Sequence, residues 1–139
     1  MLRRPLTVII LLVASAMPGC SMLNHEAPTE DADKAAVLFF QRLDKEEYDQ
    51  IYNDSAKKFK ETKTRQSVIE SLQEITAYGK TIEYQRKSMP IQAEAKIRLV
   101  SPVYMVYFDR MKGELTLTFQ DESGEWKLFG FAFKPHPRR

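Results

Sequence analysis

Apolar residues between positions 30 and 78 recur at the spacing of helices that bury one face. The spacing predicts a helix over 30–43, a short helical turn over 46–53 and a longer helix over 64–78 that stops at Gly79. The intervening segment 55–63 is predicted to be a loop or a broken helix. The apolar positions that define the two longer helices are Ala36, Val37, Phe39, Phe40 and Leu43, followed by Val68, Ile69, Leu72 and Ile75.

After Gly79 the pattern changes to the period of two that strands show. Pro90 interrupts it, Ser101-Pro102 is expected to form a bulge or an edge kink, and 121–124 is a turn signal. Helices followed by such strands indicate an α+β fold, with N-terminal helices packed on a curved antiparallel sheet of about four strands. The strands are predicted over 81–87, 95–109, 114–120 and 125–134.

The last predicted strand has apolar residues on both faces. Phe129, Phe131 and Phe133 alternate on one face, opposite Trp126 and Leu128. We therefore expect the strand to be covered on two sides, by another element of the chain or by the sheet of a second subunit, and a homodimer is one arrangement that the pattern allows. Trp126 is expected to close one end of the core, with ligand stacking as the alternative.

The N-terminal segment is typical of an export signal. Arg3 and Arg4 precede an apolar stretch over 6–16, which has the length of a signal-peptide core and is too short to span a membrane, since a span needs about 20 residues. The expected domain order is a signal peptide over 1–19, a lipidated cysteine with its tether over 20–29, one α+β domain over 30–134 and a frayed tail over 135–139.

Two cleavage patterns compete at the end of this leader. Met17-Pro18-Gly19-Cys20 resembles a lipobox, although Leu is usual in place of Met17 and Pro18 is uncommon at its position. The alternative, Ala14-Ser15-Ala16, fits ordinary small-x-small cleavage. Ordinary cleavage would leave the only cysteine of the chain as a lone thiol in an oxidising compartment, so we favour lipidation of Cys20.

Lipidation of Cys20 makes the membrane the first expected partner. The nine residues of 21–29 reach at most about 30 Å, so the domain stays close to the bilayer. Ser21 follows the cysteine, and by resemblance to Gram-negative lipoproteins the absence of Asp there favours the outer membrane, facing the periplasm.

The charge of the chain gives no sign of a nucleic-acid partner. The 139-residue chain has a formal net charge of +2, and loss of a leader that contains Arg3 and Arg4 leaves 19 basic and 19 acidic residues. A nucleic-acid site needs a clustered cationic surface. The one such cluster, Lys57 to Arg65, is interrupted by Glu61, so we expect a solvated face.

Several enzyme classes lack their residues in this sequence. The two histidines, His25 and His136, lie in the tether and the tail, so a Ser-His or Cys-His pair has no base and a zinc site has no ligand set. Glycine-rich phosphate loops are absent as well, because the five glycines are far apart. We therefore expect no cofactor and no metal.

A family resemblance rests on aromatic and turn positions between residues 35 and 133. They are Leu43-Asp44, Tyr48-Asp49-Gln50-Ile51-Tyr52, Phe59-Lys60, Tyr104 to Phe108, Glu114-Leu115-Thr116-Leu117, and Gly124 to Phe131, which contains Trp126. In these the chain resembles an uncharacterised bacterial lipoprotein domain family with a cystatin-like or nuclear transport factor 2-like fold. The resemblance implies this fold and no established chemistry. Related folds include isomerases that use an Asp base beside Tyr donors.

Aromatic residues and one carboxylate are the candidates for a pocket or partner surface: Tyr48, Tyr52, Phe59, Tyr104, Tyr107 and Asp109. Our leading hypothesis is a lipid-anchored periplasmic domain that binds a protein or a small apolar ligand without catalysis. The alternative is an isomerase-like or hydrolase-like enzyme with Asp109 as base beside Tyr107. Against the enzyme, Asp109 is well placed simply to open the turn over 109–113. A purely structural envelope role is the third hypothesis.

Overall fold

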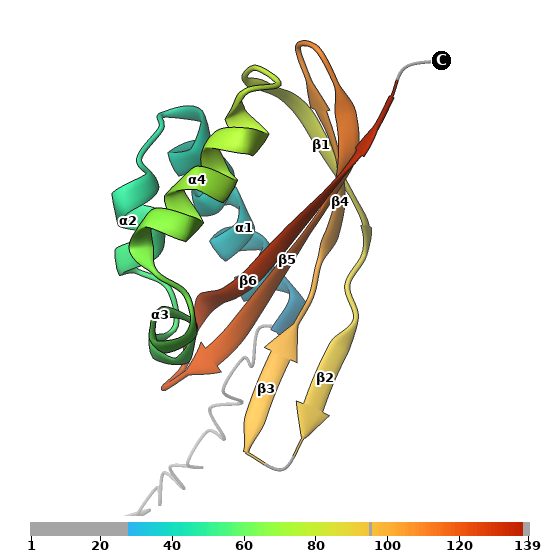
Figure 1. Ribbon diagram of the computed structural model, residues 1–139. Coiled ribbons are helices and arrows are strands. Elements are labelled where there is room, and N and C mark those ends of the chain that lie inside the picture. Colours follow the sequence, from blue (N-terminus) through green and yellow to red (C-terminus); the bar gives the residue numbers. More distant parts are fainter. Residues whose placement is uncertain (1–27, 95, 138–139) are drawn as a thin grey trace, which may run out of the picture.

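The computed structural model describes residues 28–94 and 96–137, which form four helices and six strands. The helices pack together on one side of a strongly curled antiparallel sheet, so the predicted α+β class with a curved sheet is confirmed (Figure 1). The elements are α1 (Pro28–Asp44), α2 (Tyr48–Asn53), α3 (Lys57–Thr62), α4 (Arg65–Thr76), β1 (Thr81–Ser88), β2 (Ile91–Glu94), β3 (Ile97–Val100), β4 (Val103–Phe108), β5 (Lys112–Glu122) and β6 (Glu125–His136). Residues 1–27, with the predicted leader, Cys20 and most of the tether, lie outside the described residues.

The prediction of about four strands was wrong. The strand predicted over 95–109 is two strands, β3 and β4, and β2 was not predicted. β1 and β2 form one arm of a long bent ribbon and β3 and β4 form the other, so that β1 pairs with β4 and β2 pairs with β3. β5 pairs with β4 along its first half and with β3 further on. At the bend Ser101 N–H donates to Pro90 O, and Pro102 O accepts from Leu117 N–H. Proline has no N–H to donate to a ladder. Pro90 therefore separates β1 from β2 in one arm, and Pro102 separates β3 from β4 in the other.

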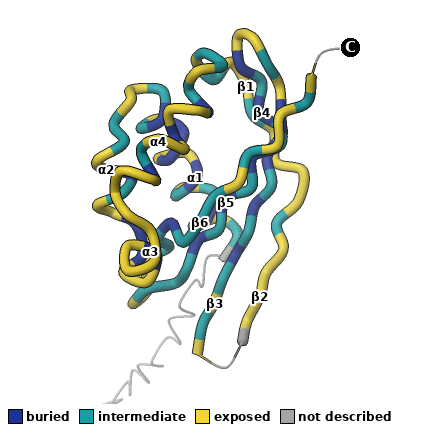
Figure 2. Tube along the Cα trace, in the orientation of Figure 1, coloured by how far each residue is buried: buried dark blue, intermediate teal, exposed yellow. Residues whose placement is uncertain are grey.

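The core lies between the helices and the concave face of the sheet (Figure 2). Its largest fully buried side chains include Phe40 of α1, Leu72 of α4 and Phe108 of β4. Most of the predicted helix stripe is buried, but Val37 is 41% exposed and lies on the flank of α1. The stripe is therefore narrower than predicted.

Asp33 of α1 joins the first helix to the sheet. Its carboxylate accepts a hydrogen bond from the hydroxyl of Tyr104 at 3.2 Å and forms an ion pair with Arg86 of β1. Burial raises the pKa of the Tyr104 phenol, and the neighbouring Asp33 carboxylate raises it further. The ring of Tyr84 stacks on Phe40 next to this contact, with 3.9 Å between ring centroids.

Contacts at both ends fix the short helix α3, where the sequence predicted a loop or a broken helix. Ala56 N–H, before its first turn, donates to Leu128 O of β6 at 2.9 Å. After its last turn, Lys63 O accepts from the hydroxyl of Tyr52 at 3.1 Å. Thr64 then caps α4, since its side chain accepts from Ser67 N–H. Tertiary contacts thus hold a helix that is too short to be stable by itself.

A bulge in β6 corrects the prediction that this strand has two apolar faces. Thr118 pairs with Gly130 and Phe119 with Leu128, so Phe129 is an extra residue in the ladder. The bulge changes the parity of the strand, and Phe131 and Phe133 lie on the same face as Leu128, toward the helices. The premise for a second cover on β6 is therefore wrong, and the homodimer stays a prediction without that support.

Candidate functional site

A groove of about 740 Å³ lies between α4 and β6. This volume lies within the usual range of ligand sites, roughly 300–1,000 Å³. We call it the α4–β6 groove. Its lining residues are Phe59, Thr62, Lys63, Ser67, Val68, Ser71, Glu74, Ile75, Tyr78, Phe129, Gly130, Phe131, Ala132, Phe133 and Pro135.

One wall of the α4–β6 groove is the flank of α4. Val68 and Ile75 are turned into the core, and this places Ser67, Ser71 and Glu74 at the exposed margin beside them. The two serine side chains are small and satisfied within the helix, as each donates to a backbone carbonyl at about 3 Å. They therefore leave room between the helix and the strand.

The opposite wall is the outer edge of β6. Five consecutive residues, 129–133, line the groove. Side chains of successive strand residues point to opposite faces, so a hollow lined by all five runs along the edge of the strand. Among the described residues, the only backbone bond that reaches β6 from outside the β5–β6 hairpin goes from Ala56 to Leu128. Beyond Leu128 the edge is open.

The register of the hairpin shows which backbone groups face outward. Glu122 and Glu125 flank a two-residue turn, so they form a hydrogen-bonded pair, and bonded pairs alternate from there. Beyond the extra residue at the bulge, the outward N–H and C=O groups belong to Phe131 and Phe133. Pro135, the next outward residue, has no N–H that could be left unpaired, as expected of a proline in an edge strand.

Aromatic rings form the apolar floor at the far end of the groove. The ring of Phe133 lies 5.6 Å from Tyr78 and 5.6 Å from Phe108, measured between centroids. It covers Gly113 of β5, where a Cβ would be 2.6 Å from two atoms of the Phe133 ring. The glycine therefore sets the depth at which this ring sits.

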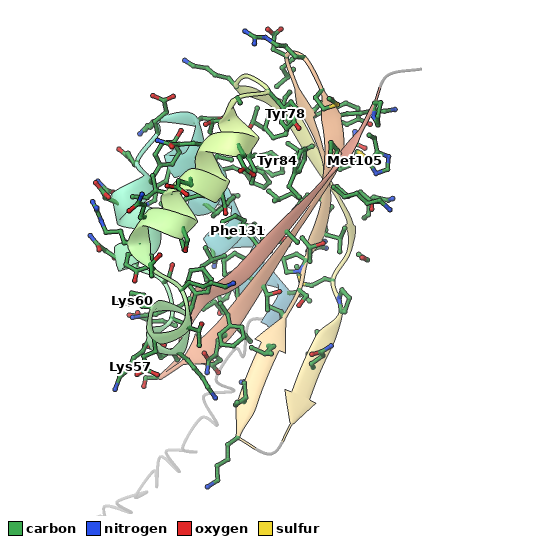
Figure 3. The ribbon with its side chains drawn as sticks, viewed as in Figure 1. Lys57, Lys60, Tyr78, Tyr84, Met105 and Phe131 are labelled. Atoms are coloured by element: carbon green, nitrogen blue, oxygen red, sulfur yellow. The ribbon has the colours of Figure 1, made fainter. Side chains whose placement is uncertain are left out.

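The near end of the groove is cationic. Lys63 lines it, and α3 carries Lys57, Lys58 and Lys60, all exposed. Within the described residues none of these four lysines forms an ion pair with a carboxylate; Lys60 Nζ donates instead to the carbonyl of Asn53. Figure 3 shows Lys57 and Lys60 at the α3 end of the helical layer, with Tyr78 at the opposite end and Phe131 between.

A second hollow of about 360 Å³ lies between α1, α2 and the start of β6. Its walls include Trp126, Leu38 and an ion pair in which Arg42 lies 2.7 Å from Asp54. The Trp126 ring packs against the core and carries Arg98 above it, 5.6 Å from the ring centroid. Trp126 therefore both packs on the core and lines this hollow, so the closing role and the ligand-stacking alternative stay predictions.

The predicted tyrosines of the helices hold α2 against its neighbours. The hydroxyl of Tyr48 is 2.7 Å from Thr76 Oγ1 on α4. The hydroxyl of Tyr52 donates to the carbonyls of Lys60, in the last turn of α3, and Lys63, just after it. Neither lines the α4–β6 groove, whereas Phe59, the third predicted residue of this half, does.

The predicted residues of the sheet, Tyr104, Tyr107 and Asp109, do not line the α4–β6 groove. Tyr104 points into the core, while Tyr107 lies on the helix-free face, because the two differ in parity along β4. Asp109 is exposed and comes after the end of β4, where Phe108 N–H donates to Met111 O across the turn at 2.7 Å. The Asp-Tyr active site stays a prediction without a cavity to support it, since neither Tyr107 nor Asp109 lines either hollow described above.

No group of three or more His, Cys, Asp and Glu side chains in the described residues is arranged to hold a metal ion. No helix of residues 28–137 is both long and apolar enough to cross a membrane.

Polar residues of the groove escaped prediction. Ser67, Ser71 and Glu74 look like an ordinary exposed helix face in the sequence, and a small residue beside Val68 and Ile75 is too weak a signal to mark a groove. The shift of large apolar positions from even numbers, Trp126 and Leu128, to odd numbers, 129 to 133, is the one available sign of the bulge.

Comparison with known proteins finds no family model that matches this chain and no curated protein that matches it. The resemblance to a lipoprotein domain family therefore stays a prediction that rests on the residues named for it.

Proposed function

We propose that this protein is a lipid-anchored lipoprotein of the bacterial cell envelope, held through Cys20, whose α+β domain binds a partner in the α4–β6 groove without catalysing a reaction. The observation that carries the binding role is the groove itself, about 740 Å³ with an apolar floor and a polar margin. The export-type leader and the lone cysteine support the anchor.

The anchor is tested by labelling cells with a palmitate analogue. The wild-type protein is expected to take up the label and to sediment with membranes. The Cys20→Ala variant is expected to do neither. An unlabelled wild-type protein in the soluble fraction would refute the anchor and leave the binding role open.

The binding role is tested with a photo-crosslinking amino acid placed at Ser71, which lines the groove, or at Gln73, an exposed position of α4 that does not. In intact cells we expect a discrete crosslinked product from position 71 and none from position 73. Equal patterns from both positions would refute a specific groove site. A product from 71 would then be identified by mass spectrometry.

A further inference from the structure

The open edge of β6 specifies what kind of partner fits the α4–β6 groove; this inference rests on the proposed binding role. Phe131 and Phe133 each direct one backbone N–H and one C=O outward, and no described residue outside β5 bonds to the backbone of β6 beyond Leu128. Unpaired strand groups of this kind are matched by the backbone of an added strand, which bonds to alternate residues along the edge.

The dimensions of the groove suit a short extended segment. The strand edge from 129 to 135 is about 20 Å long at 3.3 Å per residue, and the α4 flank from 67 to 75 is about 12 Å long at 1.5 Å per residue, with Tyr78 beyond it. An extended segment of about six residues therefore spans the space. Its alternate side chains would meet the serine margin of α4 and the aromatic floor.

Charge decides the direction and composition of the segment. β6 begins beside α3 and runs away from it, so a strand paired antiparallel to β6 ends at the exposed lysines Lys57, Lys58, Lys60 and Lys63. Those cations have no carboxylate partner within the described residues and would attract acidic groups.

We propose that the α4–β6 groove binds an extended, alternately apolar segment of another protein as an additional strand antiparallel to β6, with acidic residues at the carboxyl end of that segment against the α3 lysines. The partner is thus recognised through backbone hydrogen bonds at Phe131 and Phe133 and through charge at Lys63.

The test uses the purified full chain and fluorescein-labelled ten-residue peptides that alternate valine and threonine and end in two aspartates. By fluorescence anisotropy we expect the wild type to bind this peptide. A peptide N-methylated at alternate residues, which lacks the N–H groups of one edge, is expected to bind at least ten-fold more weakly.

Variants of the chain separate the groove from the rest of the surface. Ser71→Trp fills the groove and is expected to weaken binding at least ten-fold, whereas the matched Gln73→Trp should stay within two-fold of wild type. Lys63→Glu should weaken the acidic peptide about five-fold and leave a peptide ending in two serines unchanged. The charge control is Lys96→Glu, at the tip of the β2–β3 turn, which should leave both peptides unaffected.

Amide hydrogen exchange reports the strand itself: on saturation with the acidic peptide, exchange at Phe131 and Phe133 should slow at least ten-fold. Equal binding of the N-methylated peptide, or unchanged exchange at these two amides, would overturn strand addition. If no peptide binds but dansyl-undecanoate does, and Ser71→Trp abolishes it, the groove takes a small apolar ligand; the proposed function then stands and the inference fails. If neither probe binds and position 71 captures nothing in cells, both fail.

Discussion

Substitution of Gly113 by alanine gives a quantitative test of how closely the groove floor is packed. Gly113 is buried in β5, between Val106 of β4 and Pro135 of β6. A Cβ at this position would lie 2.6 Å from the carbonyl oxygen of Lys134 and equally close to the ring of Phe133. Because the carbonyl belongs to the backbone of a paired strand, the clash cannot be relieved by a side-chain rotation alone.

The expected cost follows from two opposing effects. Overpacking in a core costs typically about 1–3 kcal/mol, whereas replacing glycine reduces the entropy of the unfolded chain and returns about 0.4–1 kcal/mol. We therefore expect Gly113→Ala to lower the free energy of unfolding by about 1–2 kcal/mol, or to lower Tm by roughly 4–12 °C in a domain of this size.

Gly130→Ala is the matched control in the neighbouring strand. No atom outside Gly130 and its two chain neighbours lies within 4 Å of the position of the added Cβ, so the variant should be as stable as wild type or more stable by about 0.4–1 kcal/mol. Urea unfolding followed by the fluorescence of Trp126, the only tryptophan, measures both variants. Equal stabilities of the two alanine variants would refute the close packing of Phe133 over Gly113.

Three further outcomes are expected. In the free protein, the amides of Phe131 and Phe133 should exchange with solvent faster than the amide of Ala132, which bonds to β5; the opposite order, measured by NMR, would mean that the hairpin parity is wrong. Tyr104→Phe should flatten the loss of stability at high pH, because the pKa of Tyr104 is raised in the folded state. Above about pH 10 the unfolded chain loses this proton first, and the wild type loses stability by up to about 1.4 kcal/mol per pH unit. Urea titrations of the two proteins in parallel should show that the variant lacks this contribution to the slope. Ser55→Ala removes a buried hydroxyl that donates to Ile51 O at 2.6 Å and should cost about 1 kcal/mol in chemical denaturation, and an unchanged midpoint would contradict a stabilising role for that hydrogen bond.

Long amphipathic segments were predictable, and short or irregular ones were not. The stripes of α1 and α4 repeat over several turns, and both helices lie within a few residues of their predicted positions. β2 has four residues and an exposed Ile91, so its pattern carries almost no signal. α3 depends on contacts with Leu128 and Tyr52 that are distant in sequence, and local spacing does not contain them.

Of the residues predicted for a pocket or partner surface, Phe59 is the one that lines the α4–β6 groove. Tyr48 and Tyr52 were predicted as pocket or partner-surface residues, but the partner of each hydroxyl depends on how α2 docks, which the local sequence does not contain. The open strand edge was invisible because it is a property of backbone parity, which a one-residue bulge at Phe129 changes without altering composition.

The contacts of Asp33 also bear on how the domain would withstand mechanical force. A domain tethered by its N-terminus receives any pull at the start of α1, the first described element. Asp33 lies less than two turns from that point and is bonded to Tyr104 and Arg86 on two different strands. Tension applied along the tether would therefore load these two bonds before it reached the apolar contacts of Phe40, so their rupture would set the force at which the first helix begins to peel from the sheet.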